Sequence, residues 1–105
     1  MKLTYPTTLV LHALAQGFRH GFEILDVTGL PSGTVYPILR RLEGESLVSA
    51  DWEDPVIARE EQRPPRRYYQ VTPAGRALLT TALSRYQVPR SIAARARRLR
   101  PARSL

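Results

Sequence analysis

Five polar side chains between residues 30 and 43 have the types and the spacing that suit contact with a nucleic acid. They are Ser32, Thr34, Tyr36, Arg40 and Arg41. Hydroxyls, a phenol and guanidiniums donate hydrogen bonds to phosphate oxygens and to the edges of bases. Val35, Leu39 and Leu42 recur at i, i+4 and i+7, which places them on the other side of a helix. The segment therefore predicts a helix with one face in a core and one face available to DNA.

A second short helix is predicted just upstream, over residues 20–28. Gly29 stands where a helix favours a left-handed C-cap, and the hydroxyl of Ser32 suits the N-cap of the following helix. Residues 29–31 then form a turn of about three residues, which is the spacing of a helix-turn-helix. Two interpretations fit these residues alone equally well: a DNA-binding unit and an ordinary corner between two helices.

No arrangement of residues indicates an enzyme. The sequence shows no paired carboxylates, no nucleophile beside a base, no cluster of metal ligands and no phosphate-cradling glycine loop. The chain has no cysteine, which excludes disulfides and thiolate metal sites, and His12 has no partner at metal-ligand spacing. We therefore expect a protein that is not an enzyme and that needs no cofactor and no metal.

The charge of the chain is distributed unevenly. Its 105 residues suffice for one domain with a modest core, and they carry a net charge of +7. Residues 1–87 hold ten Lys or Arg and nine Asp or Glu, a balance of +1, whereas residues 88–105 hold six Arg and no acid, a balance of +6. A basic tail attracts any polyanion without regard to sequence. The case for specific DNA binding therefore rests on the body of the chain and not on its total charge.

The sequence also bears on where the protein acts. No apolar run approaches the ~20 residues of a membrane-spanning helix, and the N-terminus lacks the basic and apolar regions of a signal peptide. We expect a soluble, cytoplasmic protein with no membrane partner.

A β-hairpin is predicted after the first three helices. Residues 48–53 alternate apolar and polar side chains, which is typical of a half-buried strand, and residues 66–72 are rich in strand-forming residues. The charged, proline-rich residues 54–65 between them predict a mobile loop. Arg59, Arg63, Arg66 and Arg67 would reach a DNA backbone or minor groove from there. The alternative is a solvated loop, because Asp54, Glu60 and Glu61 dilute the positive charge.

Two further helices carry apolar surface beyond what a small core needs. Residues 7–16 are apolar nearly all round, with Thr7 or Thr8 as the N-cap, so a second chain is expected to cover one face. A helix that opens with Thr72 as N-cap and Pro73 ends near residues 88–89. We predict that the two helices form a two-fold dimer interface. Its expected residues are Leu11, Leu79, Leu83 and Tyr86. The alternative is that both helices complete the core of a monomer.

Three blocks of the sequence resemble the PadR family of bacterial transcription factors, named after the phenolic acid decarboxylase regulator. They are HGFEI at 20–24, GLPSGTVYPILRRLE at 29–43 and RYYQVTPAG at 67–75. The resemblance covers roughly residues 7–87 and implies a homodimeric winged-helix repressor of a palindromic operator. It implies DNA contacts from Ser32, Thr34, Tyr36 and Arg40, with Arg66 and Arg67 at the wing. It also implies that the helix from Pro73 dimerises against the first helix of the other subunit, as in the subfamily with a short C-terminal region.

The expected fold is mainly α with a small antiparallel β-hairpin. It is a winged helix-turn-helix DNA-binding domain over 1–72, a C-terminal dimerisation helix over 73–88 and an Arg-rich tail over 89–105. Residues 91–100 of the tail suit either a basic amphipathic helix or a disordered arm. The partners are double-stranded DNA and a second copy of the chain, and an unknown small-molecule effector stays open. The rival hypothesis is a protein-interaction module on the same scaffold, without sequence-specific DNA binding.

Overall fold

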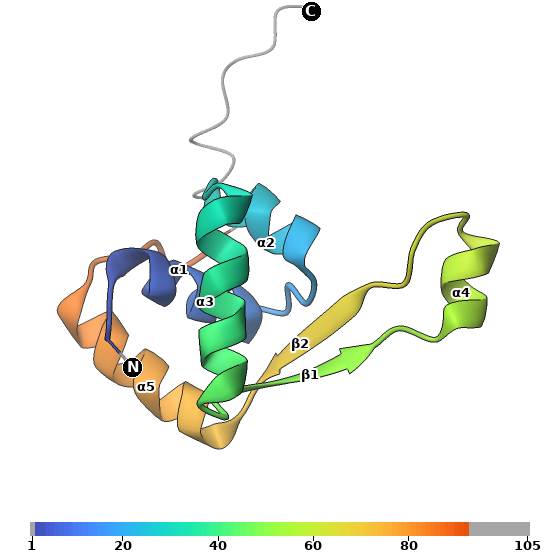
Figure 1. The fold of residues 1–105 in the computed structure, drawn as a ribbon. Helices are drawn as coiled ribbons and strands as arrows, with labels where there is room; N and C mark the ends of the chain where they lie inside the picture. The colour runs from blue at the N-terminus through green and yellow to red at the C-terminus, as the bar shows by residue number, and fades with distance from the viewer. Residues whose placement is uncertain (1, 93–105) are drawn as a thin grey trace, which may run out of the picture.

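A computed structural model describes residues 2–92 and contains five helices and two strands within them (Figure 1). The elements follow one another as α1 (Tyr5–Ala15), α2 (Gly21–Thr28), α3 (Ser32–Gly44), β1 (Val48–Trp52), α4 (Pro55–Glu60), β2 (Arg67–Val71) and α5 (Pro73–Arg85). The expected fold class, mainly helical with one antiparallel hairpin, is confirmed. None of the helices in this part of the chain is both long and apolar enough to cross a lipid bilayer.

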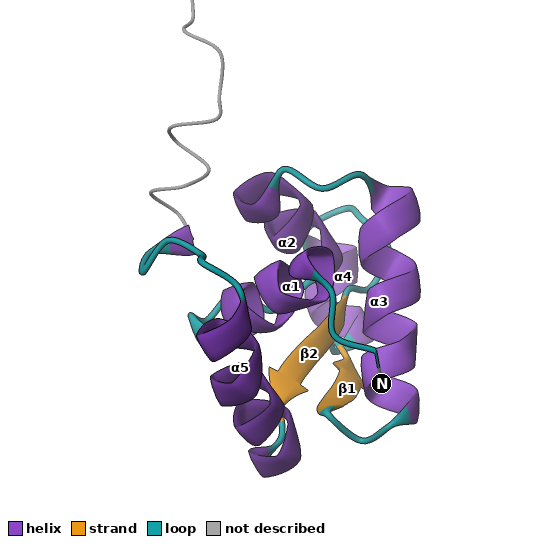
Figure 2. Ribbon diagram, turned by 90° about the vertical axis from the view of Figure 1, so that its left-hand side faces the viewer, coloured by secondary structure: helices purple, strands orange, loops and turns teal. Residues whose placement is uncertain are grey.

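Helix α1 lies at the centre of the fold, with α5 on one side of it and α3 on the other (Figure 2). It begins earlier than predicted because Thr4 is the N-cap, and its side chain accepts a hydrogen bond from the Thr7 amide at 3.2 Å. Thr7 and Thr8 are buried instead. The helix packs against α2, α3, α5 and β2 of its own chain. The apolar residues of α1 that were expected to need a second chain are therefore buried within the single chain.

Helices α2 and α3 form the expected helix-turn-helix. Gly29 ends α2 with a φ of 72°, which is the left-handed C-cap that its position predicted. The N-cap of α3 is Pro31, so the prediction that Ser32 would cap the helix is wrong. Ser32 is the first helical residue and makes no side-chain capping bond. The predicted apolar stripe is confirmed, since Val35, Ile38, Leu39 and Leu42 are all buried.

The hairpin pairs β1 with β2 in antiparallel register, from Val48 opposite Val71 to Trp52 opposite Arg67. The loop before α2 joins its edge, because the Tyr69 amide donates to the Arg19 carbonyl at 2.7 Å. The segment predicted as a loop instead contains helix α4. Its N-cap is Asp54, whose side chain accepts from the Val56 amide at 2.9 Å, and Pro55 occupies the first turn.

Helix α5 begins as predicted and ends earlier, at Arg85. Thr72 caps it, with its hydroxyl accepting from the Gly75 amide at 3.1 Å. Gly75 lies so close to the Leu47 carbonyl that a Cβ there would overlap it. The glycine therefore allows α5 to pack against the start of the hairpin. Leu79 of α5 contributes to the same hydrophobic core as α1 and α3.

After α5 the chain folds back over α1 as a C-terminal strap, which we define as residues 86–92. His12 donates from Nε2 to the Pro89 carbonyl at 2.9 Å. The side-chain amide of Gln16 donates to the Arg90 carbonyl and accepts from the Ile92 amide at 2.8 Å. Ile92 is fully buried. Residues 89–92 of the predicted tail thus pack against α1, with Ile92 in the core. The rest of the predicted tail and nearly all of its helix lie outside the described residues.

Candidate nucleic-acid interface

The outward side of α3 combines one arginine with two positions that have no side chain. Gly33, Arg40 and Gly44 are exposed and lie opposite the buried stripe of the helix. A Cβ added at Gly33 or Gly44 would meet no atom within 4 Å, so both glycines border open space. Such a surface lets the helix backbone approach a groove closely, because nothing projects beyond it at either glycine. Arg40 then stands as the most prominent side chain between them.

The other predicted contacts on α3 lie on its flanks. Ser32 and Arg41 are exposed, while Thr34 and Tyr36 are half-buried. Tyr36 is held against the start of α2, where a Cβ at Gly21 would overlap its ring and hydroxyl. Arg41 borders a different hollow, together with Lys2 and Glu45. The structure therefore does not bring all five predicted side chains to one face, and Arg40 alone occupies the centre.

A hollow of about 330 Å³ lies in the angle between α2, α3 and the hairpin. Gly21 and Phe22 of α2, Tyr36 of α3 and Arg66 line it. Phe22 is 72% exposed at its rim. The first backbone amides of α2 lie at this corner, and amides at a helix N-terminus attract anions. The hollow thus brings a helix N-terminus together with three arginines, Arg63, Arg66 and Arg67, beside α3.

Arg63, predicted to contact DNA, is instead joined to Glu53. Its guanidinium donates to both carboxylate oxygens, at 2.5 and 2.9 Å. Glu53 is only 7% exposed and also accepts from the Tyr68 hydroxyl at 3.0 Å. The hydrogen bonds from Arg63, opposed by burial, lower the pKa of Glu53 to about 2. Glu53 is therefore ionised at neutral pH, and it holds Arg63 inside the hairpin.

Arg67, another predicted DNA contact, ties the hairpin to α3. It donates to the Glu43 carboxylate at 2.5 Å, and its guanidinium carbon lies 5.1 Å from the centroid of the Trp52 ring. The hydrogen bond to Glu43 raises the pKa of Arg67. Within residues 2–92, Arg66 and Arg40 form no ion pair with a carboxylate. Arg63 and Arg67 are thus paired with carboxylates, whereas the guanidiniums of Arg40 and Arg66 form no such pair within the described residues.

His20 is a buried titratable group at the edge of this surface. Its Nε2 lies 2.8 Å from a Glu23 carboxylate oxygen, and its Nδ1 has no hydrogen-bond partner. Burial lowers the pKa of His20, with an opposing effect from Glu23 and a further lowering by Arg66. The imidazole is therefore neutral at pH 7. It packs edge-on to the Tyr68 ring at 5.8 Å and so links α2 to the hairpin.

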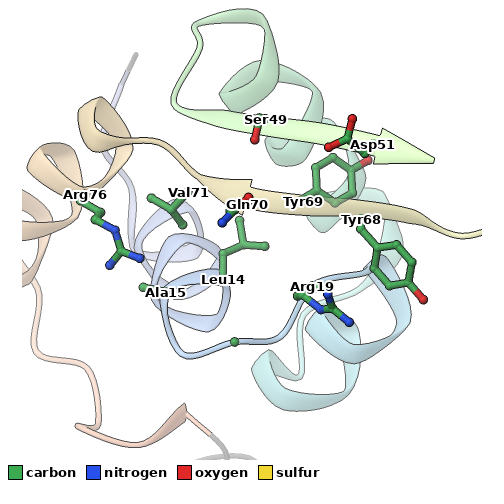
Figure 3. Close-up of a pocket in the computed structure, with 11 residues that line it drawn as sticks. Leu14, Ala15, Arg19, Ser49, Asp51, Tyr68, Tyr69, Gln70, Val71 and Arg76 are labelled. Carbon is green, nitrogen blue, oxygen red and sulfur yellow. The ribbon is translucent and has the colours of Figure 1, made fainter. Parts of the chain in front are cut away.

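The opposite face of the hairpin holds a larger groove of about 470 Å³ (Figure 3). Arg19 and Arg76 lie at opposite ends of it, and Gln70 of β2 lies between them. The guanidinium of Arg19 lies 4.9 Å from the centroid of the Tyr68 ring. In the described portion of the chain, no three His, Asp or Glu residues come together to hold a metal ion.

The predicted dimer residues differ in their surroundings. Leu11 is fully buried and Leu79 is 8% exposed, both in the core of the single chain, so Leu11 has no surface to offer a second copy. The Tyr86 hydroxyl donates to the Leu3 carbonyl at 3.1 Å. Leu83 of α5 is 40% exposed and lines a hollow together with His12 and Val88. Of these four residues, Leu83 presents the clearest apolar surface.

A helix-turn-helix followed by a hairpin defines a winged-helix DNA-binding protein. The family model described as the transcriptional regulator PadR-like family matches residues 10–81. The chain therefore belongs to the PadR-like family of transcriptional regulators, which confirms the resemblance found in the sequence. Members of this family are regulators that bind DNA. A search of curated proteins found no match.

Solved structures with the same fold include regulators of this family. A PadR-like transcription factor from Bacteroides fragilis is 25% identical over 75% of this chain and 77% of that chain, with a TM-score of 0.64. A PadR family transcription regulator from Clostridium difficile is 23% identical over 78% of this chain and 86% of that chain, with a TM-score of 0.67. BpsR of Bordetella bronchiseptica, whose DNA binding is regulated by 6-hydroxynicotinic acid, is 23% identical over 92% of this chain and 64% of that chain, with a TM-score of 0.62.

Proposed function

We propose that the protein is a transcriptional repressor that binds a palindromic operator as a homodimer. The observation that carries this proposal is the exposed side of α3, where Arg40 lies between two glycines and forms no ion pair with any acid of residues 2–92. In the proposed complex, α3 lies in the major groove and Arg40 donates to a guanine or to a phosphate. Two copies place their α3 helices about 34 Å apart, in successive turns of the groove. Bound in this way, the dimer blocks RNA polymerase.

The hollow beside α3 supplies the proposed backbone contact. A phosphate seated there meets the first amides of α2 and the guanidinium of Arg66. Such a contact fixes the register of α3 on the duplex without reading sequence. Arg63 and Arg67 take no direct part, because carboxylates already occupy their guanidiniums.

The tip of the hairpin takes no part either. The exposed residues of the segment 51–62 hold Arg59 against four acids, a balance of −3. The acids are Asp51, Asp54, Glu60 and Glu61, because Glu53 is buried and paired with Arg63. A surface with this excess of negative charge repels phosphate. Of the wing arginines expected from the sequence to contact DNA, the proposal thus keeps Arg66, which directly precedes β2.

The proposed dimer contact is the outer side of α5. Ala77, Thr81 and Ser84 are exposed there, and Leu83 borders this surface on the side that faces the strap. Small side chains allow two helices to approach closely, and the same surface on both copies gives a two-fold interface. The α5 helices then set the separation of the two α3 helices. This dimer does not need the face of α1 that the resemblance implied, because the C-terminal strap covers it.

Cytoplasmic location and regulation by a small molecule are further parts of the proposal. A repressor acts in the compartment that holds its operator, which supports the cytoplasm. The groove between Arg19 and Arg76 and the hollow beside α3 are both large enough for a small molecule. The regulation of the similarly folded BpsR by 6-hydroxynicotinic acid supports testing this compound at both sites.

Footprinting on the region upstream of the gene tests the proposal directly. We expect protection of a two-fold-symmetric sequence, with affinity that falls steeply as salt rises and that exceeds affinity for a scrambled duplex. Sedimentation of the free protein at micromolar concentration is expected to show a dimer, and Leu83→Glu is expected to shift it to monomer. Equal affinity for operator and scrambled DNA would instead support the rival interaction module.

A further inference from the structure

The outer end of the hairpin exposes an apolar surface that the DNA-binding proposal leaves unused. We define the wing-tip patch as Trp52, at the end of β1, with Val56 and Ile57 of α4. We propose that this patch binds residues 93–105 of a second copy of the same chain. The inference stands independently of DNA binding, because it involves neither α3 nor the hollow beside it.

The patch is unusual in its exposure. Trp52 is 66% exposed, Val56 is 52% exposed and Ile57 is 48% exposed. They are three of the six large apolar side chains that are exposed in the described part of the molecule. The Asp54 cap and Pro55 fix the turn that presents Val56 and Ile57, and Ala58 is buried beneath. Helix α4 thus holds the side chains of Val56 and Ile57 outward.

The charge around the patch selects the kind of occupant. The balance of −3 over the exposed residues of the segment 51–62 disfavours duplex DNA. It also disfavours a symmetric contact between two wing-tip patches, because the same negative charges would face one another. An occupant must therefore carry positive charge together with some apolar side chains.

Residues 93–105 have this composition. They contain five arginines and no acid, together with Leu99, Leu105 and four alanines. Residues 1–87, by contrast, have a balance of only +1. Within this chain, the segment after Ile92 is thus the strongest electrostatic complement to the wing tip.

The geometry of the strap assigns the segment to a second copy. Ile92 is buried with Leu9 and Ala13 of α1 and Val27 of α2, and Gln16 holds its backbone. Helix α4 lies at the far end of the hairpin, which projects away from this body (Figure 1). Docking within one chain would require the segment to run from Ile92 out to the far end of the hairpin (Figure 1). Docking between copies has no such constraint.

Trp52 provides the readout, because it is the only tryptophan in the chain. Its emission is recorded for the full-length protein without DNA, from about 1 to 100 µM. We expect a shift to shorter wavelength as concentration rises, since docking removes the indole from water. The shift should be lost at about 1 M salt, where charges are screened over a few ångströms. A full-length variant with Gln at positions 95, 97, 98, 100 and 103 should show no shift.

Matched variants separate this contact from the α5 dimer. Ile57→Ser should reduce the shift, whereas Leu83→Ser, which alters a similarly exposed apolar residue, should leave it unchanged. Glu60→Arg with Glu61→Arg should abolish the shift, and mixing this variant with a copy carrying Glu at the five arginine positions should restore it. A shift that persists without the arginines would overturn the proposal. A shift that is independent of concentration would overturn the assignment to a second copy, as would identical emission from all variants.

Discussion

Helix α3 and the hairpin both carry arginines that the sequence assigns to DNA, and the structure places the two sets in different surroundings. On α3, Arg40 and Arg41 are exposed. In the hairpin, Arg63 and Arg67 donate to Glu53 and Glu43. A guanidinium that is paired with a carboxylate directs its donors at that carboxylate. A count of basic residues therefore overstates the charge that this protein can present to phosphate.

The comparison separates recognition from positioning. Arg67 connects β2 to Glu43 near the end of α3, and Arg63 connects the end of the hairpin to Glu53. Both contacts fix the hairpin, which in turn fixes the angle at which α3 is presented. We infer that Arg63 and Arg67 act on DNA binding only through this geometry, whereas Arg40 acts directly.

The largest expected effect comes from Arg40→Ala. If Arg40 forks a guanine, the change should cost about 1–3 kcal/mol of operator binding, or roughly 5- to 150-fold in affinity. Titration of labelled operator and scrambled duplexes measures it. Arg85→Ala, which removes an exposed arginine from the end of α5, is the matched control. Equal losses in the two variants would remove Arg40 from the recognition surface and erase its contrast with the hairpin.

The next effect is a loss of stability in Arg63→Ala. The change leaves the nearly buried Glu53 carboxylate without its main donor, so the melting temperature at pH 7 should fall. Sequence preference on DNA should be retained. Arg59→Ala, a change at an exposed arginine on the same segment, should leave the melting temperature unchanged.

The pair of Arg63 and Glu53 also predicts how the stability of the fold changes at acidic pH. The native pKa of Glu53 is lowered from 4.5 to about 2 by the hydrogen bonds from Arg63. A depressed native pKa stabilises the fold fully above the unfolded value, and the contribution is lost as pH falls from about 4.5 towards 2. Thermal unfolding across this window should therefore depend less on pH in Arg63→Ala than in the wild type. Identical pH profiles would show that the pair is not formed in solution.

Much of the fold follows from local patterns in the sequence. The stripe Val35, Leu39 and Leu42 predicts α3 because helical periodicity is local, and Thr72-Pro73 predicts the start of α5 because capping is local. Helix α4 carries an equally local signal, Asp54-Pro55. The charged, proline-rich composition of residues 54–65 as a whole nevertheless predicts a loop, and the short helical signal within it is outweighed.

The remaining errors concern contacts between distant residues. Gln16 meets the Ile92 amide 76 residues away, and this contact closes the face of α1 that seemed to need a second chain. Arg67 meets Glu43 across 24 residues, so its pairing depends on how the hairpin lies against α3. The partner of Arg67 cannot be chosen from spacing, because several acids stand at comparable separations from it. The sequence could thus predict the residue types of the candidate site. It could not predict which of the arginines are paired with carboxylates.

A smaller effect is expected from Arg66→Ala. The guanidinium of Arg66 forms no ion pair within the described residues, and Arg66 lines the hollow beside α3. Loss of a phosphate contact should weaken binding to operator and scrambled DNA alike and reduce the slope of log affinity against log salt by about 1. The titration used for Arg40→Ala, repeated at several salt concentrations, measures both quantities. A loss confined to the operator would make Arg66 a reader of bases.

The smallest effect is expected from Arg67→Ala. The side chains of Arg67 and Glu43 are 32% and 33% exposed, and ion pairs that are this accessible to water contribute little to stability. We expect a slight fall in melting temperature and an unchanged preference for the operator. Glu43→Gln should behave in the same way, and the double variant should add almost nothing, because both changes remove one contact. If Arg67→Ala lost operator preference while Glu43→Gln kept it, Arg67 would leave its carboxylate to meet DNA, and the division between the hairpin and α3 would fail at this residue.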